Sequence, residues 1–250
     1  MANRPPRIGF PVQILGRSAL KTHDSRRWQN KPHLRVSLDY LREIFAYLDE
    51  QEIHMYRIVS DLAPYATHPD MPQFHGQVEE CAEELSEIGA LARELDLRLS
   101  FHPSQYIVLN AEDDDVAHRS AADVEVQAAI LEAMGLDDEA VVVLHIGGVY
   151  GDRAAARERF AHRYADLSPG AQRRVVLEND DGRFDVQDVL WIHERTGVRA
   201  VFDRHHFNLY NRGEMTAAEA ARAAMATWEE WSARPKVHFS SPRTDWGFRY

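Results

Sequence analysis

The chain has 250 residues, of which 44% are hydrophobic and 28% are charged. These fractions are typical of a globular domain and exclude a wholly disordered, collagen-like or membrane-embedded chain. Its 29 Lys and Arg against 40 Asp and Glu give a net charge of −11, which disfavours nonspecific binding to nucleic acid or anionic lipid. A nucleic-acid site in such a chain must therefore be confined to one face.

The compartment is predicted from what the sequence lacks. Cys81 is the single cysteine, so an internal disulfide cannot form. The first residues have no apolar stretch of the secretory type, and the longest apolar run, around residues 140–150, is far shorter than the ~20 residues of a membrane span. We expect a cytoplasmic protein without a membrane partner.

Strand-type runs alternate with amphipathic helix patterns along the chain. In chain order we predict a strand at 7–12, a helix at 34–48, a strand at 54–60, a helix at 77–96, a strand at 98–102, a helix at 116–134, a strand at 141–146, a helix at 152–164, a strand at 175–179, a helix at 185–196, a strand at 200–203, a helix at 216–231 and a strand at 236–240. Cys81 lies on the apolar face of the second helix, and Thr216 with Glu219 has the spacing of an N-terminal capping box.

This alternation predicts an α/β fold with a parallel sheet. Seven such units in about 240 residues fit a TIM (β/α)8-type barrel better than an open sheet. No linker or repeat is visible, so residues 1–250 are interpreted as a single domain. An eighth strand is not visible before Tyr250, so the last β/α unit is expected to be missing, truncated or irregular.

Polar residues stand at the carboxyl ends of the predicted strands, which open on one face of a parallel barrel. These residues are His102, His145, Glu178, Asp203 with His206 three positions on, and Lys236 with His238 on the last strand. Imidazoles and carboxylates together form a ligand set for Mn²⁺, Fe²⁺ or Zn²⁺, and no thiolate is present to favour a structural zinc site. A pair of such metals suits displacement at a phosphodiester.

Each member also has an ordinary interpretation. A lone His at a strand end is more often a hydrogen-bonded core or surface residue, Glu178 could cap the following helix, and Asp203 could form a turn with Arg204. A lysine that points into a barrel is costly unless a carboxylate pairs with it. Lys236 is therefore expected either to form a buried ion pair or to be a modified lysine that serves the cluster. The metal interpretation rests on the set rather than on one residue.

Several motifs together resemble, in order and approximate spacing, those of the UV damage endonucleases. They are Phe101-His-Pro-Ser-Gln-Tyr106, Leu144-His-Ile-Gly-Gly148, Leu177-Glu-Asn-Asp180, Asp203-Arg-His-His206 and Pro235-Lys-Val-His238, with Thr67-His-Pro69 and Ile8-Gly-Phe-Pro11 as two further signatures. The resemblance runs from about Ile8 to Ser241. It implies a TIM barrel related to endonuclease IV and the xylose isomerase-like enzymes.

The implied activity is DNA repair: incision of the backbone immediately 5′ to pyrimidine dimers, other UV photoproducts and some abasic sites, by water activated by two or three divalent metals, typically Mn²⁺. The implied metal ligands are His102, His145, Glu178, Asp203, His206 and His238. The resemblance also implies catalytic roles for Lys236, Glu178 and His68, with Lys236 carboxylated, and insertion of Gln105 and Tyr106 into the duplex at the lesion. Without the resemblance, Gln105 and Tyr106 would be an ordinary loop amide and phenol.

Two departures from the family pattern affect this expectation. The family continues beyond the Lys-x-His strand to another metal-site His and then a Glu, and neither occurs before Tyr250. The Gly-Tyr-Pro motif is Gly9-Phe10-Pro11 here, and the Asn that follows it in relatives is replaced in Gln13-Ile14. One metal position is therefore expected to be incomplete or to be completed differently.

Basic residues gather in the segment after the first predicted strand and are interleaved with Trp28. We expect this segment to bind the DNA backbone of a UV-damaged duplex, although a solvated basic loop is the alternative, through Lys21, Arg26, Arg27 and Lys31. A monomer that associates with the nucleoid when it acts is the expected form. Two other functions fit the barrel and the metals: a xylose isomerase-like sugar isomerase or epimerase, and a non-catalytic damage-binding protein.

Overall fold

The computed structural model of the protein describes residues 6–240. Seven parallel strands follow one another in the sheet in chain order, as the alternation predicts. They are β1 (Gly9–Pro11), β2 (Met55–Ile58), β3 (Arg98–Phe101), β4 (Val141–His145), β5 (Val175–Glu178), β6 (Arg199–Asp203) and β7 (Val237–His238). The described residues thus hold one strand fewer than a complete (β/α)8 barrel.

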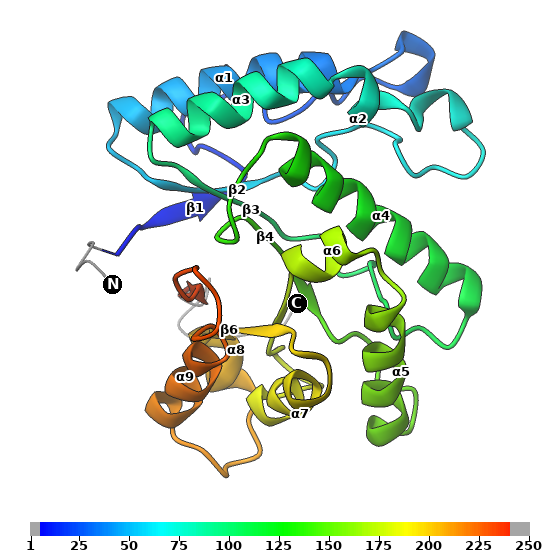
Figure 1. Ribbon diagram of the computed structural model, residues 1–250, viewed down its shortest axis with the longest axis vertical. Coiled ribbons are helices and arrows are strands. Elements are labelled where there is room, and N and C mark those ends of the chain that lie inside the picture. Colours follow the sequence, from blue (N-terminus) through cyan, green and yellow to red (C-terminus); the bar gives the residue numbers. More distant parts are fainter. Residues whose placement is uncertain (1–5, 241–250) are drawn as a thin grey trace. The chain divides into compact units, whose positions relative to one another are not determined.

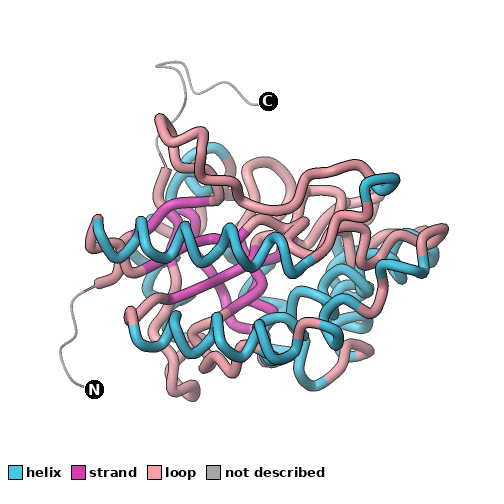
Figure 2. Tube along the Cα trace, turned by 90° about the horizontal axis from the view of Figure 1, so that it is seen from above, coloured by secondary structure: helices cyan, strands magenta, loops and turns pink. Residues whose placement is uncertain are grey.

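One or more helices connect each strand to the next. Figure 2 shows the helices in cyan and the strands in magenta. The helices are α1 (Leu34–Glu50), α2 (Gln77–Glu80), α3 (Ala82–Glu94), α4 (Asp114–Ala133), α5 (Arg153–Ala165), α6 (Pro169–Arg174), α7 (Val186–Thr196), α8 (Arg204–Leu209) and α9 (Ala217–Ala226), with short 3-10 turns η1 (Trp28–Asn30) and η2 (Pro72–Phe74). Within residues 6–240, none of them has both the length and the apolarity that a bilayer crossing requires.

The chain divides into two compact units, which are described separately. The first comprises residues 1–102 and 122–142, and the second comprises residues 103–121 and 143–250. Strands β1 to β3 belong to the first unit, β5 to β7 belong to the second, and β4 runs from one into the other.

In the first unit, α1 and α3 lie side by side (Figure 1). The apolar stripe that the sequence predicts for α1 is buried: Leu34, Leu38, Leu41, Phe45 and Leu48 are at most 1% exposed. Burying such a side chain stabilises the fold by about 1.5–3 kcal/mol, so this stripe fixes which face of α1 packs inward. Cys81 is fully buried, as expected from its place on the apolar face.

In the second unit, α5 packs on α7 and α9 packs on β6. Thr216 and Glu219 form the predicted capping box at the start of α9, and α7 begins with a second one, in which Asp185 and Asp188 cap each other's backbone. Each box satisfies backbone N–H groups that a helix start leaves unpaired. These caps determine where the two helices begin after the preceding loops.

Several elements differ from the sequence prediction. The predicted helix 77–96 is interrupted at Cys81, where α2 ends and α3 begins. The short helices α6 and α8 were not predicted, since six residues carry too little periodicity; each begins at a capping side chain, Ser168 and Asp203 respectively. Strand β7 is limited to two residues, and Lys236 directly precedes it.

Candidate metal centre

Four chemically active side chains occupy the last position of successive strands in the second unit. His145 ends β4, Glu178 ends β5, Asp203 ends β6 and His238 ends β7. In a parallel sheet these carboxyl ends meet at one edge, and the structure brings the four residues to that edge as the sequence predicts. His206 joins them from the first turn of α8, three residues after Asp203.

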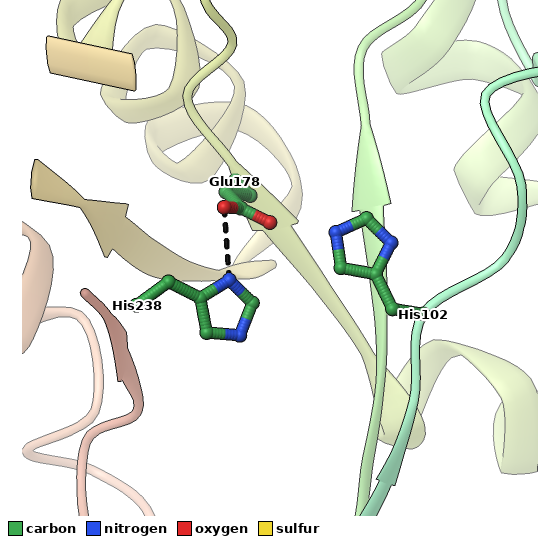
Figure 3. Close-up of side chains that lie close together, drawn as sticks. All are labelled: His102, Glu178 and His238. Atoms are coloured by element: carbon green, nitrogen blue, oxygen red, sulfur yellow. Dashed lines mark hydrogen bonds and ion pairs between the residues drawn. The ribbon is translucent and has the colours of Figure 1, made fainter. Parts of the chain in front are cut away.

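Glu178 is the centre of this group, and we refer to Glu178, Asp203, His145, His206 and His238 together as the histidine cluster. The carboxylate is 1% exposed. His238 Nδ1 lies 2.9 Å from Glu178 Oε1 in a hydrogen bond (Figure 3). His206 Nδ1 lies 3.5 Å from the same oxygen, and His145 Nε2 lies 3.8 Å from Glu178 Oε2. One buried carboxylate is thus surrounded by three imidazoles.

The spacing and the charge of the cluster fit a divalent cation. His145, Glu178 and His206 each offer a ligand atom within 4.8 Å of the other two. Burial raises the pKa of Asp203, and the neighbouring negative charge of Glu178 raises this pKa further. A bound cation would relieve this cost, because it favours the ionised form of a buried carboxyl that lies beside another carboxylate. The five residues of the cluster offer imidazole and carboxylate donors, which are typical of catalytic zinc sites, whereas thiolates are typical of structural ones.

Asp203 has the kind of local structural role that the sequence also allows, whereas Glu178 does not. Asp203 does form a local cap: its side chain accepts a 2.8 Å hydrogen bond from the backbone N–H of His206 at the start of α8. Glu178 does not cap the helix that follows it, because Asp185 is the N-cap of α7. This hydrogen bond links the side chain of one candidate ligand, Asp203, to the backbone of another, His206.

His102 and His68 lie in the first unit. His102 directly follows β3, and its carbonyl accepts a 3.0 Å hydrogen bond from Ser60 Oγ. The His68 ring lies 6.2 Å from the ring of Tyr65, and its Nδ1 accepts from the backbone N–H of Asp70 at 3.3 Å. The contact of His102 is made by its backbone and those of His68 by its ring, and the metal and catalytic roles of the two residues stay predictions.

Lys236 is 3% exposed, as expected for a lysine that points inward. It lies one residue before β7, so Lys236 and His238 flank Val237, which is exposed. This alternation agrees with the prediction that the two side chains share one side of the strand. A buried ammonium is costly unless a partner or a modification compensates its charge.

The two residues predicted to probe the lesion lie on a loop, residues 102–113, that is exposed at its tip and bonded at its base. Gln105 and Tyr106 are exposed, with 76% of Tyr106 accessible. Ser120 Oγ accepts from the N–H of Val108 at 2.9 Å, and Arg163 on α5 donates to the carbonyl of Leu109 at 3.1 Å. Hydrogen bonds within the second unit therefore hold the base of this loop, while its tip is exposed.

The basic segment contains residues with different roles. Arg26 donates to both oxygens of buried Asp24, at 2.7 and 2.6 Å, so its charge is matched within the chain. Lys21 Nζ lies 5.3 Å from the Tyr40 ring centroid. Arg27 and Lys31 are exposed and have no ion pair to any residue in the 6–240 range. Of the four predicted phosphate contacts, Arg27 and Lys31 are thus the most available.

Sequence reasoning missed two buried asparagines of the second unit, Asn110 and Asn179, which are 0% and 1% exposed. Asn179 lies in the motif Leu177-Glu-Asn-Asp180, in which only Glu178 is predicted to have a role. An amide directly after a strand-ending carboxylate was the available signal. Asn110 lies in the loop 102–113, four residues after Tyr106, and carried no comparable signal.

The sequence is similar to those of one family of known proteins. Residues 18–249 match the model of the UV-endonuclease UvdE family. UV DNA damage endonucleases of Bacillus velezensis and Bacillus cereus strain G9842 are 33% and 32% identical over 81% and 96% of this chain. The chain spans 63% of the length of the first and 75% of the second.

Solved structures show the same relationship. The crystal structure of SacUVDE is 27% identical, with a TM-score of 0.83 over 96% of this chain and 82% of that one. A D-psicose 3-epimerase crystallised with D-fructose is 14% identical, with a TM-score of 0.53 over 88% and 69% of the two chains, which is a likeness of fold alone. The predicted TIM-barrel-type α/β fold is confirmed, and the chain belongs to the UV-endonuclease UvdE family.

Proposed function

We propose that the chain is a metal-dependent endonuclease of DNA repair that incises the backbone immediately 5′ to UV photoproducts and some abasic sites, leaving a 3′ hydroxyl and a 5′ phosphate. The observation that carries the proposal is the buried carboxylate of Glu178 among three imidazoles at the strand ends. Family membership supplies the substrate class, and the cluster supplies the chemistry.

The residues of the cluster would hold divalent cations, of which Mn²⁺ is proposed, two or three per chain. His145, Glu178 and His206 offer one set of donor atoms. Asp203 and His238 are further proposed ligands, and His102 is proposed as a ligand from the family motif. When bound, such cations activate water and neutralise the charge that develops on the phosphate and on the departing oxygen.

The chain's own residues have separate tasks in this proposal. Gln105 and Tyr106, exposed on their braced loop, would enter the duplex at the lesion and favour damaged DNA, where unstacking costs least. Lys236, proposed to be carboxylated, and His68 would serve the reacting phosphate. We also propose that residues 1–250 form one domain, that the protein is a monomer, and that it acts in the cytoplasm on double-stranded DNA at the nucleoid.

The direct test is an end-labelled duplex with a single pyrimidine dimer, incubated with the purified chain and Mn²⁺. A nick directly 5′ to the dimer is expected, and chelation should abolish it. His145→Ala should also abolish it while the protein keeps its helical circular dichroism. His162→Ala is the matched control, because His162 lies on α5 with its side chain 81% exposed and outside the cluster; this variant should nick normally.

Three other outcomes contradict the proposal in distinguishable ways. Retention of the damaged duplex without a nick would favour the non-catalytic damage-binding protein. Neither retention nor a nick would leave the sugar isomerase or epimerase as the better interpretation of the barrel. Normal nicking by His145→Ala would show that the ligand assignment is wrong.

A further inference from the structure

Asn179 connects two members of the histidine cluster through its side chain. The residue follows Glu178 directly and is 1% exposed. Its Nδ2 donates to the backbone carbonyl of Asp203 at 3.1 Å, and its Oδ1 accepts from the backbone N–H of Asp203 at 2.9 Å. One amide thus satisfies both backbone groups of a candidate ligand, beyond the point where Glu178 pairs with Val201 in the β5 and β6 ladder.

The backbone carbonyl of Asn179 binds the second member. His206 Nδ1 lies 3.0 Å from this oxygen. The same nitrogen lies 3.5 Å from Glu178 Oε1 and 3.9 Å from Asp203 Oδ1. A carbonyl can only accept a hydrogen bond, so Nδ1 must carry the proton in this contact.

Protonation at Nδ1 leaves the lone pair of the neutral ring on Nε2. A metal-binding histidine ordinarily donates its other ring N–H to a carbonyl or carboxylate, which fixes both the tautomer and the orientation of the ring. The Asn179 carbonyl occupies the place of that partner. In this tautomer Nε2 is the ring atom of His206 that can ligate a cation.

These bonds close a circuit of three residues. Asn179 fixes the backbone of Asp203, the Asp203 side chain caps the backbone N–H of His206, and the His206 ring returns to the carbonyl of Asn179. Loss of any bond in such a circuit loosens the other two, since each residue is held by both neighbours. The first turn of α8 and the end of β6 are therefore held at one spacing.

We propose that Asn179 is a positioning residue of the histidine cluster: its amide holds Asp203 in place, and its carbonyl sets the Nδ1–H tautomer of His206. The inference rests on the proposed function, in that the cluster must hold a divalent cation. Asn179 itself does not touch the cation or the substrate in this account. It acts by preparing two ligands before a cation arrives.

The first readout is the tautomer of His206 in the metal-free protein, measured from the ring ¹⁵N shifts of a histidine-labelled sample. Wild type should show a single Nδ1–H form. Asn179→Ala should show a mixture of tautomers, because the amide bonds that hold the Asp203 backbone are lost. Asn179→Asp has the same shape and keeps an acceptor for the Asp203 N–H, so it preserves a folded sample even where alanine does not; it cannot donate to the Asp203 carbonyl and should also show a mixture.

The second readout is affinity for Mn²⁺ alone, titrated without DNA. Removal of an outer partner of a ligand typically costs 10–100-fold in metal affinity, and we expect Asn179→Ala and Asn179→Asp to fall in this range. Gln77→Ala is the matched control: it removes another fully buried amide, one that bonds to the backbone groups of Leu34, Pro64 and Phe74 in the first unit. Its Mn²⁺ affinity and His206 tautomer should equal those of wild type.

The inference and the proposed function can fail separately. Wild-type Mn²⁺ affinity and an unchanged His206 tautomer in folded Asn179 variants would overturn the inference, and so would an equal loss in Gln77→Ala. A wild-type protein that binds Mn²⁺ but does not nick damaged DNA would instead refute the proposed function, while the tautomer and affinity data would still decide the role of Asn179.

Discussion

The side chain of Asn110 pairs with both backbone polar groups of Gly148: Nδ2 donates to the carbonyl at 2.8 Å, and Oδ1 accepts from the N–H at 3.1 Å. This approach is close because Gly147 has a φ of +112° and no side chain; a Cβ there would lie 2.3 Å from Asn110 Oδ1. Arg159 on α5 donates to the Asn110 carbonyl at 3.1 Å. The loop that carries Gln105 and Tyr106 is thereby fixed to the loop that follows His145.

We predict that Asn110→Ala lowers the preference for damaged DNA. The substitution leaves the two polar groups of Gly148 without their amide partner, at a cost of about 1–3 kcal/mol for each buried group that stays unsatisfied, and the loop tip gains freedom. The ratio of nicking rates on dimer-containing and undamaged duplexes should fall. Gly147→Ala should have the same effect, because its Cβ would displace the Asn110 amide. An unchanged ratio in both folded variants would show that the brace is irrelevant to lesion recognition.

We predict that Glu178→Gln removes the thermal stabilisation that Mn²⁺ gives to the wild type. A ligand that binds only the folded state stabilises it by about 2.7 kcal/mol at a concentration 100 times its dissociation constant. A neutral amide in place of the central carboxylate should reduce that affinity and with it the shift in melting temperature. The measurement is the melting temperature with and without 1 mM Mn²⁺, taken as about 100 dissociation constants. Glu219→Gln is the control, since Glu219 caps α9 and should keep the shift. Equal shifts in all three proteins would argue against Glu178 as a ligand.

The sequence predicted the strand order and the strand-end residues of the second unit because both follow from strong local patterns. The aliphatic runs of β4 and β5 and the position of Glu178 at a strand end need no tertiary information. The role of Asn179 could not be predicted, because an amide has the same appearance in sequence whether it bonds to solvent or to the Asp203 backbone 24 positions away. The pairing of Arg26 with Asp24 was missed for a related reason. The sequence shows that the segment is basic, but it does not show which of its basic residues forms an ion pair with Asp24.

Because Arg26 pairs with Asp24, we predict that substitutions of neighbouring basic residues affect DNA binding differently. Arg27→Gln and Lys31→Gln should each weaken binding to duplex DNA and reduce the slope of log affinity against log salt by about 1, because each removes one phosphate contact. Arg26→Gln should leave the slope near its wild-type value and lower the melting temperature, because Arg26 is already bonded to a buried carboxylate. Fluorescence anisotropy from 50 to 200 mM salt distinguishes them. The opposite pattern, in which only Arg26→Gln changes the slope, would show that Arg26 contacts a phosphate and that Arg27 and Lys31 do not.

Asp24 predicts a pH dependence of stability. Burial opposes its ionisation, but the hydrogen bonds from the Arg26 side chain and from the backbone N–H groups of His33 and Arg26 outweigh burial and hold the pKa of Asp24 below its ordinary value of 3.8. The carboxylate therefore stabilises the folded state fully above the unfolded pKa near 3.8, and this contribution is lost as the pH falls through the lower, folded value.

Asp24→Asn keeps the size of the side chain and removes its charge. We expect it to lower the free energy of unfolding by about 1–3 kcal/mol at pH 7, because two of the bonds to Asp24 come from a guanidinium and strengthen with its charge. Urea unfolding of wild type and variant from pH 7 to pH 3 gives the difference directly. It should stay constant down to about pH 5 and then shrink as the wild-type carboxylate takes up its proton. A difference that persists unchanged to pH 3 would mean that shape rather than charge at position 24 holds the basic segment in place.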